Sequence, residues 1–300
     1  MAVSSRAYYN APPQGRAATQ GRLPDGRQKS RSGVNERKTN MNLNHITVTI
    51  APYGPIDVST VRTVLALRDC GANLLIHDAQ ADVSLTRSCI CHAAYEKLDK
   101  STDYVFFLDH DIAAPPEAFL RLTEISERLT DHYQTLTSVS GIYINRHLPD
   151  KAIVAAWKLR DQDPINYGHP KASPDAVIIP ALTGLGAFCM PVNAFMAHVE
   201  ESERACFPDP DHTVARVCQT GLVTAEYLQR FIDHKKLVEA PKGCLYWNME
   251  DFDFCCREFD HGRMVVAAPI NFAHRGKIPG NRTLFPGYNP AEHEATIIGW

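Results

Sequence analysis

The chain has 300 residues, of which 44% are hydrophobic and 22% charged, and its formal net charge is -3 at pH 7. This composition is ordinary for a globular protein and allows one large domain or two small ones. A net charge so close to zero offers no overall field that would attract nucleic acid or a membrane surface. No apolar run reaches the ~18 residues of a membrane span, and the first residues lack the apolar core of a signal peptide. We therefore expect a soluble, cytoplasmic protein.

The cysteine pattern argues against disulfides and against zinc. The count is odd, the positions are scattered, and most lie in apolar runs, which predicts free and partly buried thiols in a reducing compartment. The two close pairs lack the spacing and the second ligand pair of a zinc site. The nine cysteines are Cys70, Cys89, Cys91, Cys189, Cys206, Cys218, Cys244, Cys255 and Cys256.

Residues 1–42 differ in composition from the rest of the chain. They carry eight Arg and Lys residues against Asp25 and Glu36, and almost no branched aliphatic residues. Such a segment cannot bury enough apolar surface to fold alone, so we expect a basic, disordered tail. The alternative is an electrostatic arm that binds an anionic partner.

The next part of the chain alternates between strand-like and helix-like patterns. β-branched runs bounded by Pro, Gly and Asp predict strands, and apolar residues spaced three and four apart predict helices. Gly71 is expected to end the first helix, and Pro115 or Pro116 to occupy the first turn of the third. The predicted strands are 45–52, 72–78, 103–109 and 135–144, and the predicted helices are 58–71, 84–98 and 115–129. This order predicts an α/β protein with a mainly parallel central sheet sandwiched by helices.

The second half is less regular. Residues 175–199 predict a strand, a glycine-containing turn, a short apolar strand and a helix, and residues 200–245 predict helices and loops. Residues 248–262 predict a helix that Gly262 ends, and residues 263–276 a last strand. Residues 277–300 have the composition of a loop.

Asp109 and Asp111 directly follow the apolar run VFFL at the end of a predicted buried strand. In an open α/β sheet, ligands bind beyond the carboxyl ends of the strands. Two carboxylates at such an end suit a hard divalent cation such as Mg²⁺ or Mn²⁺, which keeps waters and substrate phosphates as further ligands. The alternative is that one aspartate caps a turn or the next helix.

Three further segments contain residue types suited to the same chemistry. Asn248 is a candidate N-cap for a helix whose first turn holds Glu250 and Asp251, although acidic residues at that position also stabilise a helix without any other role. His274 follows an apolar strand and is either a metal ligand or a structural histidine. The segment TGLGAF at 183–188 is either a tight turn or a place where the backbone approaches a sugar or phosphate.

In this order the segments resemble the GT-A glycosyltransferases, and most closely the family-2-like nucleotide-sugar transferases with an Asp-x-Asp motif. The resemblance runs from about residue 46 to 276, and it rests on several motifs in order rather than on any one. Ser88 stands where the family's Ala-Arg-Asn segment has its Asn. The matching segments are VTIAPYG at 48–54, LTRSCICHAAY at 85–95, DYVFFLDHDIAAPPEAFLRL at 103–122, SGIYINRH at 140–147, TGLGAFCMPVNAF at 183–195, EDFDFCCREFDHG at 250–262 and APINFAHRG at 268–276.

The resemblance implies a single-domain GT-A (Rossmann-like) fold over residues 43–276 and a role for each motif. It implies a metal ion, Mn²⁺ or Mg²⁺, held by Asp109, Asp111 and His274. It implies Asp251 as the general base and Glu250 as a residue that orients a sugar. The residues 277–300 would close over the donor. The implied donor-binding residues are Pro52, Tyr53, Gly54, Asp78, Arg87, Asp109, Gly184, Gly186, Arg275 and Lys277.

The resemblance also implies transfer of a sugar from a nucleotide diphosphate sugar to an acceptor hydroxyl, with inversion and with UDP more expected than GDP as the nucleotide. The acceptor implied by the resemblance would be a glycan, a protein or a modified nucleic acid. A retaining GT-A transferase and a non-catalytic GT-A-like binding module are the alternatives, and a nucleotidyltransferase is disfavoured because no glycine-rich phosphate loop follows the first strand. Transferases of the eukaryotic secretory pathway usually carry a membrane anchor, so we expect a bacterial, viral or phage origin. Nothing in the sequence predicts the oligomeric state.

Overall fold

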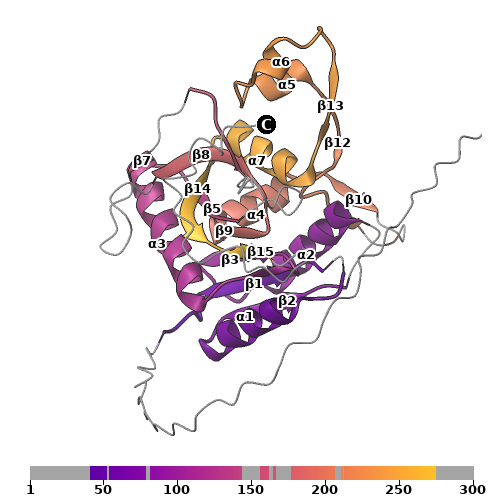
Figure 1. Ribbon diagram of the computed structural model, residues 1–300. Coiled ribbons are helices and arrows are strands. Elements are labelled where there is room, and N and C mark those ends of the chain that lie inside the picture. The colour runs from indigo at the N-terminus through magenta and orange to yellow at the C-terminus, as the bar shows by residue number, and fades with distance from the viewer. Residues whose placement is uncertain are drawn as a thin grey trace, which may run out of the picture. The chain divides into compact units, whose positions relative to one another are not determined.

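A nine-stranded sheet forms the centre of the protein, with the strand order β2-β1-β3-β9-β5-β14-β8-β6 and with β7 beside β8 (Figure 1). The structure is a computed structural model that describes residues 41–52, 54–78, 82–143, 156–161, 165–166, 177–206, 211 and 213–274. The predicted segments 1–40 and 275–300 lie outside these residues, so their assignment as a tail and a closing loop stays a prediction. The described residues all belong to one compact unit.

The strands are β1 (Ile46–Ile50), β2 (Asn73–Ile76), β3 (Tyr104–Leu108), β4 (Ile112–Ala113), β5 (Thr137–Ile142), β6 (Ala156–Lys158), β7 (Ile165–Asn166), β8 (Val177–Thr183), β9 (Ala187–Pro191), β10 (Arg204–Cys206), β11 (Thr213–Ala215), β12 (Gly221–Thr224), β13 (Leu245–Asn248), β14 (Met264–Asn271) and β15 (Ala273–His274). The helices are α1 (Val58–Asp69), α2 (Val83–Lys97), α3 (Pro116–Tyr133), α4 (Val192–Glu201), α5 (Ala225–Gln229), α6 (Lys235–Val238) and α7 (Glu250–Asp260).

The sheet is mixed: it has the mostly parallel core that the sequence predicted, and it also contains antiparallel strands. β1 pairs in parallel with β2 and β3, because the crossover helices α1 and α2 connect these three strands, and β5 pairs in parallel with β14. β9 lies antiparallel between β3 and β5, and β8 lies antiparallel to β14. β8 and β9 therefore run in the same direction, and the chain changes its strand partners at residues 184–186 without reversing. This change of partners brings residues 184–186 to the end of β3.

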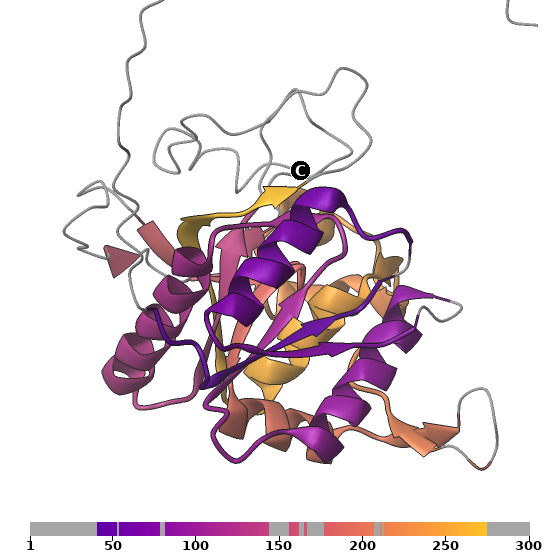
Figure 2. The ribbon, with the colours of Figure 1, turned by 90° about the horizontal axis from the view of Figure 1, so that it is seen from below.

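Helices cover both faces of the sheet, as predicted, and alternate side chains of β3 divide between two cores. Phe106 and Leu108 face α1 and α3, while Val105 and Phe107 face α2, α4 and α7. Figure 2 shows α1 and α3 on one side of the strands and α2 and α4 on the other. The mixed α/β architecture with a central covered sheet is that of a Rossmann-like protein.

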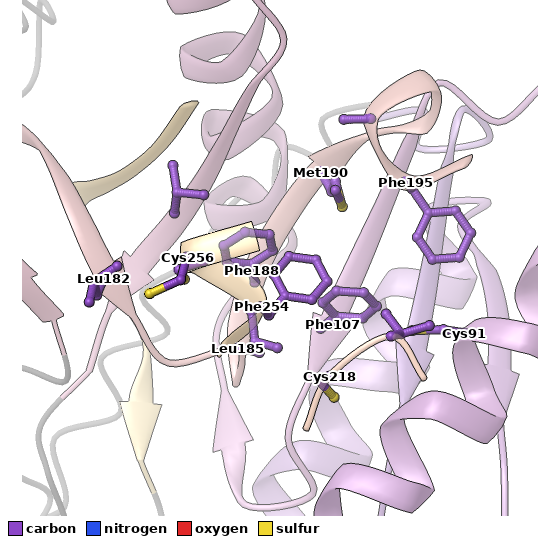
Figure 3. Packing of buried hydrophobic residues seen from close by; sticks show 14 of the residues in the cluster. Cys91, Phe107, Leu182, Leu185, Phe188, Met190, Phe195, Cys218, Phe254 and Cys256 are labelled. Carbon is purple, nitrogen blue, oxygen red and sulfur yellow. The ribbon is translucent and has the colours of Figure 1, made fainter. Parts of the chain in front are cut away.

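The second core fixes the position of α7. The ring of Phe254 lies 5.7 Å from Phe107 and 5.6 Å from Phe188, centroid to centroid, in edge-to-face geometry (Figure 3). The same ring stacks on His198 at 4.0 Å. A fully buried Phe contributes about 2–3 kcal/mol by removal of its apolar surface from water. This cluster holds α7 rigidly against the sheet, so the first turn of α7 is fixed as well.

Most of the predicted helix ends are confirmed. Gly71 and Gly262 follow α1 and α7 with φ of 92° and 74°, a left-handed conformation that favours glycine. Pro115 is the N-cap residue of α3 and Pro116 its first residue. The prediction that Asn248 caps α7 is wrong, because Met249 holds that position and makes no side-chain cap bond. Asn248 is instead the last residue of β13.

Residues 204–248 contain two antiparallel ribbons, β10–β11 and β12–β13, whereas only helices and loops were predicted for residues 200–245. β12 and β13 are separated by the twenty residues 225–244, which include α5 and α6, so no short hairpin signal marks their pairing. All nine cysteines are free thiols, as predicted. No helix among the described residues is long and apolar enough to cross a membrane.

Candidate active site

Three neighbouring parallel strands end at the same level, and predicted site residues follow each of them. Ile50 pairs with Ile76 of β2 and with Leu108 of β3, so β1, β2 and β3 leave the sheet together. Pro52, Asp78 and Asp109 therefore lie along one edge, which is the carboxyl edge of these strands. Ligands of open α/β sheets bind at this edge.

Asp109 is held tightly at the end of β3. Its backbone N–H donates to the carbonyl of Gly186 at 3.0 Å, and its own carbonyl accepts from Ile112 N–H at 3.2 Å. Both Asp109 and Asp111 are buried, with 8% and 6% of their surfaces exposed. Neither caps α3, because the N-cap of that helix is Pro115. Two aspartates buried at a strand end without capping the next helix favour the ligand-binding interpretation over the capping alternative.

Arg87 in α2 connects Asp109 with Glu250. One terminal nitrogen of its guanidinium donates to Asp109 Oδ1 at 2.8 Å, and the other donates to Glu250 Oε1 at 3.0 Å. All three side chains are buried, and Arg87 is 5% exposed. The rigid fork of a guanidinium suits this double bond, which a lysine cannot make. Arg87 thereby fixes the end of β3 and the start of α7 relative to each other.

Gly184 and Gly186 give room to polar groups of the site. A Cβ at Gly186 would lie 2.6 Å from Asp109 Oδ2, and a Cβ at Gly184 would lie 1.9 Å from the Tyr143 hydroxyl and 3.4 Å from Asp251 Oδ2. The Gly186 N–H donates to the Tyr143 hydroxyl at 3.2 Å. The glycine segment is therefore more than a tight turn, because its backbone is packed against two acids and a tyrosine. Burial, and then the negative charges of Asp109 and Asp251, raise the pKa of Tyr143 well above its usual value.

Glu250 and Asp251 form the first turn of α7, where the helix dipole favours negative charge. Burial, and then the neighbouring charge of Glu250, raise the pKa of Asp251 to about 7, although Arg87 and the N–H of Phe252 oppose this rise. The side chain of Glu250 is buried, and its Oε2 has no hydrogen-bond partner among the described residues. A carboxyl group with a pKa near 7 exchanges its proton at neutral pH, which suits a general base.

Comparisons with known proteins provide little further information. No protein-family model matches the chain, and no curated protein matches it. Among solved structures, "Crystal Structure of A197 from STIV" is similar at 14% sequence identity and a TM-score of 0.42, over 77% of this chain and 85% of that chain. A similarity at that level is too low to carry an argument about fold or function. The case for the site therefore rests on its own geometry.

The residues present fit a divalent cation in part. β15 pairs with β4 so that the backbone of His274 lies opposite Ile112, the residue after Asp111. A carboxylate and an imidazole are suitable donors for Mn²⁺. Asp109 is less suited, because Arg87 bonds Oδ1 and Gly186 packs against Oδ2. No group of three His, Cys, Asp or Glu side chains that could hold a metal is present among the described residues, and the side chain of His274 is outside them.

The structure thus brings together most of the predicted site. Asp109, Gly184, Gly186, Glu250 and Asp251 come from three separate segments and converge near Arg87 of α2, and Pro52, Gly54 and Asp78 lie along the same edge of the sheet. A Cβ at Gly54 would lie 3.3 Å from His110 Nε2, so the loop after β1 contacts the residue between the two aspartates. Tyr53, Arg275 and Lys277 lie outside the described residues, and their roles stay predictions.

Tyr143, which contacts both glycines, was not among the predicted site residues, although it lies in the matching segment SGIYINRH. Its position at the end of the predicted strand 135–144 was the available signal, because residues at strand ends of such a sheet face the ligand. A pocket of about 580 Å³ lies at the opposite end of β3, and its lining includes Asp103, Tyr104 and Glu127 but none of the residues of the candidate site.

Proposed function

We propose that the protein is a metal-dependent glycosyltransferase with a GT-A fold that moves a sugar from a nucleotide diphosphate sugar to an acceptor hydroxyl. The observation that carries this proposal is the Asp251 carboxyl, whose pKa is raised to about 7, beside the glycine segment at the carboxyl edge of the sheet. Arg87 connects this acidic turn to the Asp109 end of β3. A base and a candidate metal site at one sheet edge support transfer chemistry over simple binding.

The donor would lie across the ends of β1, β2 and β3. Pro52, Gly54 and Asp78 would contact the nucleoside, because they follow the strands furthest from α7. The backbone of Gly184 and Gly186 would contact the donor sugar, since no side chain there keeps a ligand away. Arg275 and Lys277 would contact the phosphates with charge-assisted hydrogen bonds. A UDP-sugar is the first expected donor, followed by a GDP-sugar.

Asp111 and His274 would hold the divalent cation, Mn²⁺ or Mg²⁺, on the grounds of backbone placement and donor chemistry. When bound, the ion would neutralise charge that develops on the departing nucleotide diphosphate. Asp109 would act through Arg87, because its Oδ1 is already bonded to that guanidinium. Its role would be to keep Arg87 and Glu250 in position rather than to reach the donor.

Asp251 would accept the proton of the acceptor hydroxyl as the oxygen attacks the anomeric carbon. Its raised pKa gives it enough basicity to take the proton at neutral pH, while a good fraction remains ionised. Glu250 would orient a sugar through Oε2, the oxygen that makes no hydrogen bond among the described residues. A base opposite the leaving group produces inversion in a single displacement.

Two alternatives remain distinguishable by experiment. A retaining transferase with the same fold would give a product with the anomeric configuration of the donor, which NMR spectroscopy reads directly. A non-catalytic binding module would bind the nucleotide sugar without any turnover. The raised pKa of Asp251 favours an enzyme, because binding alone gives no reason to keep a carboxyl near neutrality.

The first test is a thermal-shift screen of UDP-, GDP- and CMP-sugars with and without Mn²⁺. We expect one class of nucleotide sugar to raise the melting temperature only when Mn²⁺ is present. We expect Asp111→Ala to abolish this increase. Asp111→Asn serves as the control for size, because it keeps the shape and loses the charge. Donor binding that is unchanged by metal and by both variants would contradict the proposed metal site.

A further inference from the structure

The ribbon of β12 and β13 exposes large apolar side chains on its outer face. Leu222 pairs with Trp247, and Thr224 pairs with Leu245, so these four side chains share one face of the antiparallel pair. Met249 is the next residue on that face, because its backbone is still extended (φ -80°, ψ 157°). Figure 1 shows the ribbon leading from α5 and α6 into the start of α7.

The outer face is unusually exposed for its composition. Trp247 is 64% exposed, Leu222 61%, Leu245 56% and Met249 47%. In a ribbon packed on a core, alternate residues are apolar inside and polar outside. The inner residues Val223 and Tyr246 already pack on the core. The four outer apolar residues therefore do not contribute to the core. Contiguous exposed apolar surface of this kind marks an interaction site.

The residue types on this face favour an uncharged ligand. Its remaining residue is Thr224, so none of its five residues is charged. A nucleic acid or an anionic membrane surface would be bound through Lys and Arg, which the face lacks. The apolar C–H face of a pyranose ring buries well against an indole, and an aromatic side chain holds such a ring at low cost in conformational entropy.

The outer face lies close to Asp251 along the chain. Trp247 and Met249 come four and two residues before Asp251, and the chain between them is extended until α7 begins. Anything seated on Trp247 and Met249 is thus adjacent to the acidic first turn. An acceptor must reach this turn to deliver a hydroxyl to the proposed base.

We propose that Leu222, Leu245, Trp247 and Met249 form the acceptor-binding surface, and that the acceptor is an uncharged glycan with a pyranose ring stacked on Trp247. This inference rests on the proposed function, and it narrows the acceptor from glycan, protein or nucleic acid to neutral glycan. The donor half of the site is built from other segments, so the two halves are separable by mutation.

The binding test uses the full chain and neutral oligosaccharides of three to six rings, such as malto-, cello- and chito-oligosaccharides. Because Trp247 is well exposed, we expect at least one class to change the intrinsic tryptophan fluorescence in a saturable way. Trp247→Ala should weaken this binding at least tenfold, measured by calorimetry, and Trp247→Phe should keep part of it. Leu65→Ala, on an exposed apolar site of α1 at 43% exposure, is the matched control and should bind normally.

The kinetic test separates this inference from the proposed function. With the preferred donor, Trp247→Ala should raise KM for the glycan at least tenfold while the slow hydrolysis of the donor by water stays unchanged. If the wild type shows no turnover of any donor and no metal-dependent nucleotide binding, the proposed function fails. If hydrolysis is present and Trp247→Ala transfers normally, only the acceptor surface is wrong.

Other occupants of the face give different results. Cosedimentation with anionic phosphatidylserine vesicles that Trp247→Ala abolishes would overturn the glycan assignment in favour of a lipid surface. A dimer in light scattering that becomes a monomer in Trp247→Ala would show that a second copy covers the face. Absence of binding to every neutral oligosaccharide, with donor turnover intact, would overturn the inference too.

Discussion

Replacing Arg87 with methionine removes the cation that holds two buried carboxylates. Methionine keeps most of the side-chain volume, so the change tests charge rather than packing. The side chains of Arg87, Asp109 and Glu250 are 6%, 12% and 7% exposed, and each carboxylate loses a bond of 2.8–3.0 Å. Breaking a buried ion pair from one side costs about 3–5 kcal/mol, because the remaining charge is left uncompensated. For a domain of this size the loss corresponds to a fall in Tm of about 6–20 °C.

The assay is urea unfolding of wild type and Arg87→Met at pH 7.5. Arg87→Lys should be intermediate, since a single ammonium cannot bond both carboxylates. The double variant Arg87→Met/Glu250→Gln should be more stable than Arg87→Met alone, because one of the two uncompensated carboxylates is removed. A decrease in the free energy of unfolding of less than about 1 kcal/mol at pH 7.5 would refute the inference that Arg87 holds Asp109 and Glu250 in position.

The remaining predictions concern the base, the glycine segment and the second core. Asp251→Asn should keep donor binding and lower transfer about 10²–10⁴-fold, and wild-type activity should rise with pH through about 7. Because burial raises the pKa of Asp251 to about 7 from its usual 3.8, the folded state binds more protons between these values, so wild-type stability falls as pH rises through that window. Asp251→Asn should therefore match wild type near pH 4 and exceed it above pH 7 in urea unfolding. Gly186→Ala places a methyl group 2.6 Å from a carboxylate oxygen and should cost about 1–3 kcal/mol, whereas Gly221→Ala, with no atom within 4 Å, should be neutral. His198→Leu removes a bond of 2.6 Å to the fully buried Glu258, which keeps its bond to Arg263, and should cost about 1–3 kcal/mol in the same assay; no change would contradict that pairing.

The first half of the fold was predictable because its signals are local. The run VFFL before Asp109 predicted β3, and the prolines predicted the start of α3, since both depend on residues a few positions apart. The parallel pairing of β1, β2 and β3 followed from the helices between them. The carboxyl edge that gathers Pro52, Asp78 and Asp109 was therefore visible in the sequence.

The mixed part of the sheet depends on contacts between distant segments. The insertion of β9 between β3 and β5 brings Phe188 opposite Phe107 and Ser140, and nothing within residues 183–195 specifies this pairing. β12 and β13 likewise pair across the intervening α5 and α6. The local sequence predicted strands at some of these positions, but it did not predict which strands pair with one another.

The candidate site was predicted as a set of residues but not as a network. Asp109, Glu250 and Asp251 were singled out, yet Arg87 was expected to bind the donor, and its bonds to both Asp109 and Glu250 became visible only in the structure. Such bonds join α2, β3 and α7, whose relative placement is set by the second core. Asn248 was expected to cap α7, because the sequence does not show that β13 extends through that residue.

Donor turnover is the most direct test of the central claim. Each UDP-, GDP- and CMP-sugar is incubated with the full chain and Mn²⁺, and the release of free nucleotide and the configuration of the product are followed by NMR spectroscopy. We predict release of nucleotide diphosphate from one donor class by wild type, an inverted product, and donor binding without turnover in Asp251→Asn. Absence of turnover with every donor, together with absence of metal-dependent nucleotide binding, would contradict the account.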